Sequence, residues 1–336
     1  MKCTIQNIAD HLGLSRNTVS KALKNSSEVS ENTRNLVIKT ASKLGYKNAT
    51  FATPVIPASE TGSNGTILFL TRTYASDSEF WTTVLRGIES ILSNANYHLA
   101  ISIMSDSDLK QLNFPQTISD SSIKGIILVE ICDKVVCDAL SQFNLPIVSV
   151  DMPNVPFEEL NGIDVVTMES KKNLKKIINQ LIEKGAESFG FVGDLYSPNV
   201  SRGFQERYNA LSECLAEHQL PLNQKNCLLH QTPEDFRNFQ TTVNNLQAMI
   251  SLPDVFICGN DWTAIQLIYA LQFLGFQIPK DICVVGFDNI PAASRISPSL
   301  TTISTPQKYL GIAAARQILE RIQHPNCPHV FCQYET

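Results

Sequence analysis

The 336-residue sequence contains no hydrophobic run of the roughly 18 to 20 residues that a membrane-spanning helix needs. Its first ten residues, MKCTIQNIAD, lack an apolar core long enough for a secretory signal peptide, and Asp10 interrupts them. Both absences argue against a membrane or secreted protein. We therefore expect a cytoplasmic protein with no membrane partner.

The cysteines lack any pairing pattern. Nine of them are spread along the chain without a C-x-x-C pair, which predicts reduced, mostly buried thiols rather than a disulfide framework. His324, Cys327, His329 and Cys332 carry metal-ligating side chains, but they lie within nine residues of a proline-rich segment instead of forming two separated pairs. We expect no metal site and no cofactor.

The sequence motifs of common enzyme classes are missing as well. There is no G-x-S-x-G, P-loop, H-E-x-x-H or complete G-x-G-x-x-G motif, and the six histidines are dispersed without a recognisable triad order. We therefore expect a protein without catalytic activity.

The length predicts two or three domains, and 43% hydrophobic with 18% charged residues is ordinary for a globular protein. The charge is distributed unevenly. Residues 1–50 carry eight basic and three acidic side chains, a net charge of +5 within a chain whose total is −5. A small basic module on a large acidic body indicates that only the module contacts a polyanion.

Three short helices are predicted in this basic module from hydroxyl-bearing N-caps and glycine stops. The first runs over residues 4–12 and stops at Gly13, the second runs from the Ser15 cap to about Asn25, and the third runs over residues 30–44. Two helices joined by a tight glycine turn, the second of them basic, make a helix-turn-helix.

The second helix has a face without acidic residues. At about 100° per residue, the polar side chains fall on one side and Val19, Ala22 and Leu23 on the other. A solvated helix normally mixes charges of both signs, so contact with DNA is favoured over a merely solvated basic face. Arg16 and Asn17 suit the edges of guanine and adenine, and Lys21 suits a base or a phosphate. The other candidate DNA contacts are short polar side chains: Thr4, Ser15, Thr18, Ser20, Asn25, Ser30 and Thr33.

The run TIQNIADHLGLSRNTVSKALKNSSEVSENTRNLVIKTASKLGY resembles the DNA-binding headpiece of the lactose/galactose repressor (LacI/GalR) family. The T-x-x-x-[IV]-A start, GLS, TVSKALKN, VSENTR and LGY carry the resemblance. It implies a homodimer in which each headpiece (residues 1–48) reads one half of a near-palindromic operator in double-stranded DNA.

Residues 49–64 have the composition of a linker. The family usually places A-R-x-L here, a short helix that inserts a leucine into the minor groove. Ala52 and Val55 match the alanine and the leucine positions, but Pro54 and Pro57 bracket them, and a proline inside a helix costs about 3 kcal/mol. We expect a weak or absent hinge helix.

From residue 65 onward, apolar β-branched runs alternate with helical patterns, which predicts parallel sheets covered on both faces. The expected strands are 66–70, 98–103, 125–129, 147–150, 163–167, 188–193, 255–259 and 282–287. The expected helices include Trp81–Ser93, Lys171–Lys184, Thr263–Leu274 and Lys308–Ile322.

This part resembles the family's periplasmic-binding-protein-like core, most closely in NDWTA, GFQIPKD, VVGFDNIP and LTTI. The expected fold is therefore α/β, with a three-helix helix-turn-helix headpiece and a two-lobed core (residues 65–336) of parallel doubly wound sheets. We expect an N-lobe of about residues 65–162 and 307–323, and a C-lobe of about residues 163–306 and 324–336.

Ligands of doubly wound sheets bind beyond the carboxyl ends of the strands, here between the lobes. The candidate effector contacts at such positions are Trp81, Asp151, Asn260, Asp261 and Asp288. Aspartates at strand ends also serve as helix caps, and Trp81 could belong to the lobe core, so these alternatives stay open.

The resemblance adds two residues to this set. Arg207 matches the family's effector-binding arginine, although Ala210 and Leu211 replace the glycine and the aromatic residue of that motif, and Arg202 is the alternative. Phe236 matches an aromatic residue that forms a wall of the effector site in the family. Carboxylates, an amide, a guanidinium and aromatic faces together suit a polyhydroxylated ligand.

We therefore expect a transcriptional repressor of carbohydrate-utilisation genes, switched by a small ligand that is a sugar or sugar derivative. A purine corepressor is the alternative within the same class. A sugar-binding protein that does not bind DNA is disfavoured by the basic headpiece, and an enzyme by the missing motifs.

Overall fold

The computed structural model describes residues 4–23, 29–30, 33–34, 36–37, 40–41, 63–72, 78–195, 201–230 and 238–336. They fall into two compact units, the headpiece unit Met1–Gly62 and the core Ser63–Thr336. The predicted linker up to residue 62, including both of its prolines, lies outside the described residues, as do Asn25 and Phe236. None of the described helices is long and apolar enough to span a membrane.

The headpiece contains α1 (Ile5–Leu12) and α2 (Arg16–Leu23), and residues 33–34, 36–37 and 40–41 are helical as well. Thr4 caps the start of α1 and Gly13 caps its end, with a φ of 63°, the left-handed conformation that glycine adopts readily. The helices share a small apolar core built from both sides of the turn. Its buried members are Ile8, Ala9, Val19, Ala22, Val29, Val37 and Ala41.

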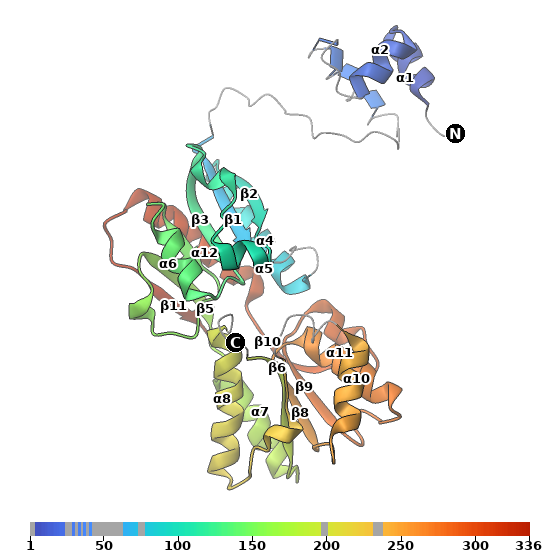
Figure 1. Cartoon of the computed structure of the whole chain (residues 1–336), viewed down its shortest axis with the longest axis vertical. Coiled ribbons are helices and arrows are strands. Elements are labelled where there is room, and N and C mark those ends of the chain that lie inside the picture. The colour runs from blue at the N-terminus through green and yellow to red at the C-terminus, as the bar shows by residue number, and fades with distance from the viewer. Residues whose placement is uncertain are drawn as a thin grey trace. The chain divides into compact units, whose positions relative to one another are not determined.

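The core alternates strands and helices (Figure 1). The strands are β1 (Thr66–Thr71), β2 (His98–Ile103), β3 (Ile123–Val129), β4 (Ile147–Ser149), β5 (Ile163–Met168), β6 (Phe189–Asp194), β7 (Leu228–His230), β8 (Val255–Cys258), β9 (Cys283–Asp288), β10 (Thr301–Ser304) and β11 (Phe331–Tyr334). The helices are α4 (Glu79–Leu92), α5 (Asp106–Gln111), α6 (Lys134–Ser141), α7 (Lys172–Glu183), α8 (Arg202–Glu217), α10 (Phe239–Ala248), α11 (Asp261–Phe273) and α12 (Gln307–Gln323). Short 3₁₀ turns span 116–119, 157–159, 224–226 and 291–294.

Two wholly parallel sheets define the lobes. The N-lobe sheet has the strand order β11-β5-β4-β3-β1-β2, and the C-lobe sheet has the order β10-β9-β8-β6-β7. The predicted α/β fold with two doubly wound lobes is confirmed. All eight predicted strands form, and β7, β10 and β11 are additional strands that the sequence did not predict.

The strand pairing corrects the expected lobe boundaries. β5 pairs with β4, and β11 pairs with β5, so 163–168 and 331–334 belong to the N-lobe rather than the C-lobe. The buried carboxylate of Asp164 fixes this arrangement. It accepts hydrogen bonds from Arg321 Nε at 3.0 Å, from Gln317 Nε2 at 3.0 Å and from the Val330 N–H at 2.9 Å, which ties α12 and the C-terminal segment to β5.

Each sheet buries both faces, as its near-continuous apolar strands require. In the N-lobe, Leu68 and Leu70 of β1 face α5 and α6, while the alternate residues Ile67 and Phe69 face α4 and α12. In the C-lobe, one face packs on α7 and α8 and the other on α10 and α11.

α4 and α12 pack unusually closely. A Cβ atom added to Gly311 would lie 2.0 Å from the carbonyl oxygen of Val84, and one added to Gly87 would lie 2.2 Å from that of Lys308. Because larger side chains would collide with the facing backbone, the two glycines let the helices meet backbone to backbone and act as one rigid pair.

Candidate functional site

The headpiece presents a polar helix face. Arg16 and Asn17 are exposed at the start of α2, while Val19 and Ala22 of the same helix are buried against α1. The first turn of α2 contains no acidic residue. The structure therefore brings together the side chains predicted to read base edges, on the face opposite the apolar one.

The predicted phosphate-contacting hydroxyls lie at helix starts. Ser15 Oγ accepts the N–H of Thr18 at 3.0 Å, and Ser30 Oγ accepts the N–H of Thr33 at 3.3 Å. Thr4 Oγ1 accepts the N–H of Asn7 in the same way. Each hydroxyl caps a helix, so these residues have a structural role that is independent of any DNA contact. Ser20 and Lys21 are half-buried on α2.

The core site has an N-lobe wall that the register of β3 and β4 creates. Leu128 pairs with Ser149, so Glu130 and Asp151, each two residues further on, follow neighbouring strands side by side. Trp81 of α4 joins them, because its indole Nε1 donates a hydrogen bond to Glu130 Oε1 at 2.5 Å. Glu130 has a left-handed backbone with φ 58°.

The opposite wall comes from β8 and β9. Ile257 pairs with Val285, so Gly259 and Phe287 are in register at the carboxyl ends of these strands, and Asn260 and Asp288 follow them. Asp288 has a φ of 123°, a strained conformation for a residue other than glycine. Its carbonyl oxygen accepts hydrogen bonds from Gln307 Nε2 at 2.6 Å and from Thr305 Oγ1 at 3.1 Å.

Arg207 of α8 lies between these walls and is only 3% exposed. Its Nη1 donates to the carbonyl oxygen of Gly259 at 2.6 Å, and its guanidinium carbon lies 3.8 Å from the ring centroid of Phe287. Its Nε is buried without a hydrogen-bond partner in the described part of the chain. The structure thus places Arg207 in the site, whereas the alternative, Arg202, forms an ion pair with Glu206 at 2.8 Å.

Besides the bond from Gln307 to Asp288, other contacts hold the lobes together around this site. The N–H of Arg202, at the start of α8, donates to the carbonyl oxygen of Met152 at 3.0 Å, directly after Asp151. On the other side, Glu79 Oε2 at the start of α4 accepts the N–H of Ala292 at 2.8 Å. These contacts bring strand ends from both lobes to one place.

The electrostatics of the site are dominated by buried acids. Burial raises the pKa of Asp151 to about 6, against the stabilising effects of the Met152 N–H, Arg207 and the Cys132 thiol. Burial likewise raises the pKa of Asp288 well above its usual value, although Arg207 opposes the shift. Within the described residues the Asp288 carboxylate accepts no hydrogen bond. Buried groups with unused hydrogen-bonding capacity and shifted pKa values are typical of binding sites.

The neighbouring predicted residues Asn260 and Asp261 have structural partners. Asp261 is fully buried, and its carboxylate accepts the Thr302 hydroxyl at 2.5 Å and the Ile290 N–H at 2.9 Å. Asn260 caps α11 by accepting the N–H of Thr263 at 2.9 Å. The sequence left helix capping open as the alternative for Asp261, but its carboxylate instead bonds β10 and the segment after β9, and Asn260 is the residue that caps α11. The Asp261 carboxylate contributes charge to the site without facing it.

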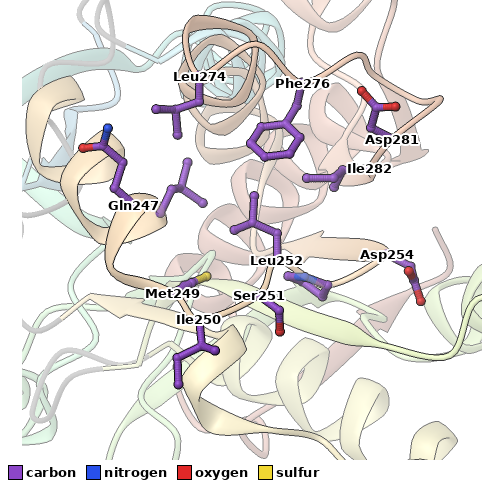
Figure 2. Close-up of a pocket in the computed structure, with 12 residues that line it drawn as sticks. Gln247, Met249, Ile250, Ser251, Leu252, Asp254, Leu274, Phe276, Asp281 and Ile282 are labelled. Carbon is purple, nitrogen blue, oxygen red and sulfur yellow. The ribbon is translucent and has the colours of Figure 1, made fainter.

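A separate pocket of about 460 Å³ lies at the opposite end of the C-lobe sheet (Figure 2). Its lining includes Leu252, Phe276 and Ile282, before β8 and β9 begin. Its two carboxylates are already used: Asp254 accepts three hydrogen bonds from residues 187–188, and Asp281 accepts the N–H of Gln277. This pocket is therefore distinct from the charged site.

Sequence reasoning missed three residues of the charged site. Glu130 follows a strand just as Asp151 does, so the same strand-end argument could have found it. Cys132 counters the rise in the pKa of Asp151, and Gln307 holds the backbone of Asp288. Neither has a sequence signal, because both act on a neighbour that is distant in the chain.

Comparison with known proteins follows the same division of the chain. Residues 4–48 match the family of bacterial regulatory proteins called the lacI family, and residues 178–331 match the periplasmic binding protein-like domain. The chain belongs to the LacI family. It is thus a DNA-binding transcriptional regulator with a ligand-binding core, in a family of regulators rather than enzymes.

Similar proteins align over nearly the whole length of this LacI-family chain. The ribose operon repressor of Haemophilus influenzae is 27% identical over 96% of the chain and 93% of its own length. The transcriptional repressor PurR of Photobacterium profundum is 26% identical over 96% of the chain and 93% of its own. The solved lac repressor dimer bound to operator and the anti-inducer ONPF shares the fold, with a TM-score of 0.66 at 18% identity, covering 100% of this chain and 97% of that one.

Proposed function

We propose that this LacI-family regulator represses carbohydrate-utilisation genes. It binds a near-palindromic operator as a homodimer, and a sugar bound between the two lobes changes its operator affinity. The observation that carries the proposal is the electrostatic interaction of Arg207 with Asp288 at the carboxyl ends of the C-lobe strands. Both side chains are buried at converging strand ends, and both keep hydrogen-bonding capacity that the described residues do not use.

The chemistry of these groups suits a sugar. A carboxylate accepts hydrogen bonds from hydroxyl groups, and the guanidinium of Arg207 donates to hydroxyl or ring oxygens. The indole of Trp81, held by Glu130, supplies a flat apolar face on which a sugar ring can stack. Similarity to a ribose operon repressor supports the same ligand class.

The headpiece supports the DNA-binding part of the proposal. Exposed Arg16 and Asn17 at the start of α2 have the geometry for bidentate contacts in a major groove. The lac repressor, whose fold this chain shares, was solved as a dimer on its operator. We infer the same mode of assembly here, with one headpiece for each half-site.

A purine corepressor is the second candidate, favoured by one observation. The Trp81 indole at the site can stack on a purine as well as on a sugar, and PurR is among the similar proteins. The two functions differ in sign, because a corepressor strengthens operator binding whereas an inducer weakens it.

The test starts by selecting bound duplexes from a random DNA pool with the full-length protein. Operator affinity is then measured by fluorescence anisotropy between 50 and 200 mM salt, alone and with D-ribose or hypoxanthine. We expect affinity to fall on the order of 10³-fold or more with salt, and D-ribose to weaken binding at least about 10-fold, which is about 1.4 kcal/mol of coupling.

The variant Arg207→Met provides the matched control. It keeps the headpiece intact, so it should bind the selected operator normally and lose the response to ligand. Undetectable or salt-independent DNA binding would refute the regulator proposal, and strengthening by hypoxanthine alone would select the purine alternative.

A further inference from the structure

Among the described residues around the core site, acids outnumber bases. The carboxylates of Asp151, Asp261 and Asp288 interact with a single guanidinium, that of Arg207, as does Glu206, which pairs with Arg202. The sheet register and the tether between Arg202 and Met152 place them together, independently of any titration argument.

Arg207 also already has partners within the protein. It donates to the carbonyl oxygen of Gly259 at 2.6 Å and lies over the ring of Phe287, and the nearby Asp288 and Asp151 balance its charge. A hydroxyl oxygen can accept from its remaining N–H groups without disturbing this balance. A phosphate would instead need the whole guanidinium while lying among carboxylates of its own sign.

Some of the helix starts around the site also favour a neutral ligand over an anionic one. Helix N-termini are the usual anion-binding elements because they present N–H groups and a positive dipole end. Here three of them carry the protein's own acids, namely Glu79 in the first turn of α4, Asp133 as the cap of α6 and Asp261 in the first turn of α11, whereas the first turns of α8 and α12 carry none.

Other cations beside the site are paired with acids. Arg202 contacts Glu206 at 2.8 Å, and Lys134 contacts Asp138 at 2.6 Å. In the described part of the core, therefore, these cations are already matched by carboxylates, whereas a phosphate would require cations that it can bind itself.

We propose that this effector site takes an uncharged ligand rich in hydroxyl groups and rejects the phosphorylated or carboxylated form of the same ligand. The inference rests on the proposed sugar response and narrows it to unmodified sugars. The buried Arg207 with its unpartnered Nε marks the ligand position, and at neutral pH the ionised carboxylate of Asp151 accepts from hydroxyl groups while it repels anions.

The test compares matched pairs by isothermal titration calorimetry on the full-length protein. The pairs are D-ribose with D-ribose 5-phosphate, D-glucose with D-glucose 6-phosphate, and D-galactose with D-galacturonate. We expect the neutral member of at least one pair to bind, and its anionic counterpart to bind at least about 100-fold more weakly.

Charge variants separate repulsion from steric exclusion. Asp151→Asn removes one negative charge from the site, and Glu217→Gln removes one from the exposed end of α8, where Glu217 pairs with Lys175. Asp151→Asn should reduce the discrimination between neutral and anionic ligands at least about 10-fold, and Glu217→Gln should leave it unchanged.

An anionic member that binds as tightly as its neutral partner, or more tightly, overturns this inference and leaves the sugar response intact. The inference also fails if the Asp151→Asn variant discriminates as strongly as the unmodified protein. If no member of any pair binds, the proposed sugar response fails, and the inference that rests on it fails too.

Discussion

Replacing Asp288 with asparagine should stabilise the ligand-free core while it abolishes the ligand response. Burial raises the pKa of Asp288 well above its usual value despite the nearby Arg207, so the folded state disfavours the ionised carboxylate. Within the described residues nothing donates a hydrogen bond to it. Each unit by which the folded pKa exceeds the unfolded value costs about 1.4 kcal/mol at a pH above both values, and asparagine has nearly the same shape without an ionisable proton.

The magnitude follows from that cost. About 1–2 kcal/mol of relief corresponds to a rise in Tm of roughly 2–8 °C, because 1 kcal/mol shifts Tm by about 2–4 °C for domains of 150–250 residues. The gain depends on pH. A carboxyl whose folded pKa is raised destabilises the protein progressively as pH rises above its unfolded value of about 3.9. The Asp288→Asn variant and the unmodified protein should therefore have similar Tm values near pH 4 and diverge toward pH 7.

Thermal unfolding of both proteins between pH 4 and 8, with and without a bound sugar, is the assay. Asp254→Asn is the matched control in the same lobe, since its carboxylate accepts three hydrogen bonds and its loss should lower Tm. If Asp288→Asn lowers the Tm of the ligand-free protein at pH 7, or still responds to ligand, Asp288 is a structural residue and this reasoning is wrong.

Three further predictions test other parts of the molecule. Arg16→Ala should cost about 1–3 kcal/mol of operator binding and relax the base preference at one position. Lys21→Ala should weaken binding to all DNA sequences evenly and reduce the salt dependence, and fluorescence anisotropy over a salt series distinguishes the two effects. Sugar affinity should rise with pH through about 6, where hydroxyl donors favour ionised Asp151, and calorimetry between pH 5 and 7 should find no such step in Asp151→Asn. Asp164→Asn leaves Arg321 buried without its anion and should lower the free energy of unfolding by about 3–5 kcal/mol, as measured in urea. An unchanged free energy of unfolding would show that the ion pair does not stabilise the core.

The parts of the site that could be predicted from the sequence depend on local pattern. Asp151 and Asp288 each follow a continuous apolar run, and the carboxyl ends of parallel strands meet at one edge of a sheet whatever the strand order. The positions of Arg16 and Asn17 could also be predicted from the sequence, because a capping serine and a glycine turn fix which face of a short helix is apolar.

The parts that could not be predicted depend on pairing between distant segments. An apolar run such as 163–168 reads the same in either lobe, and only its hydrogen bonds to β4 and β11 assign it to the N-lobe. Gln307 shows the same limit, since nothing near it in sequence indicates that its amide holds Asp288, which lies 19 residues earlier. The function of Asp261 was ambiguous for a related reason: a carboxylate at a strand end can bond the protein or face a ligand, and only its partners decide.

The arrangement of Gln307 and Trp81 explains why a small ligand can act on the whole core. Gln307 begins α12 and fixes the strained backbone of Asp288, whereas Trp81 lies on α4. The contacts at Gly87 and Gly311 make α4 and α12 one rigid pair, so that a ligand bound to both Asp288 and Trp81 acts on the orientation between the lobes instead of deforming the N-lobe. Such a ligand shifts the equilibrium only by the difference between its affinities for the two orientations. The contact between Glu79 and Ala292 links the two lobes in the present orientation. Its strength therefore sets part of the free-energy difference between the two orientations, which the ligand must overcome or reinforce.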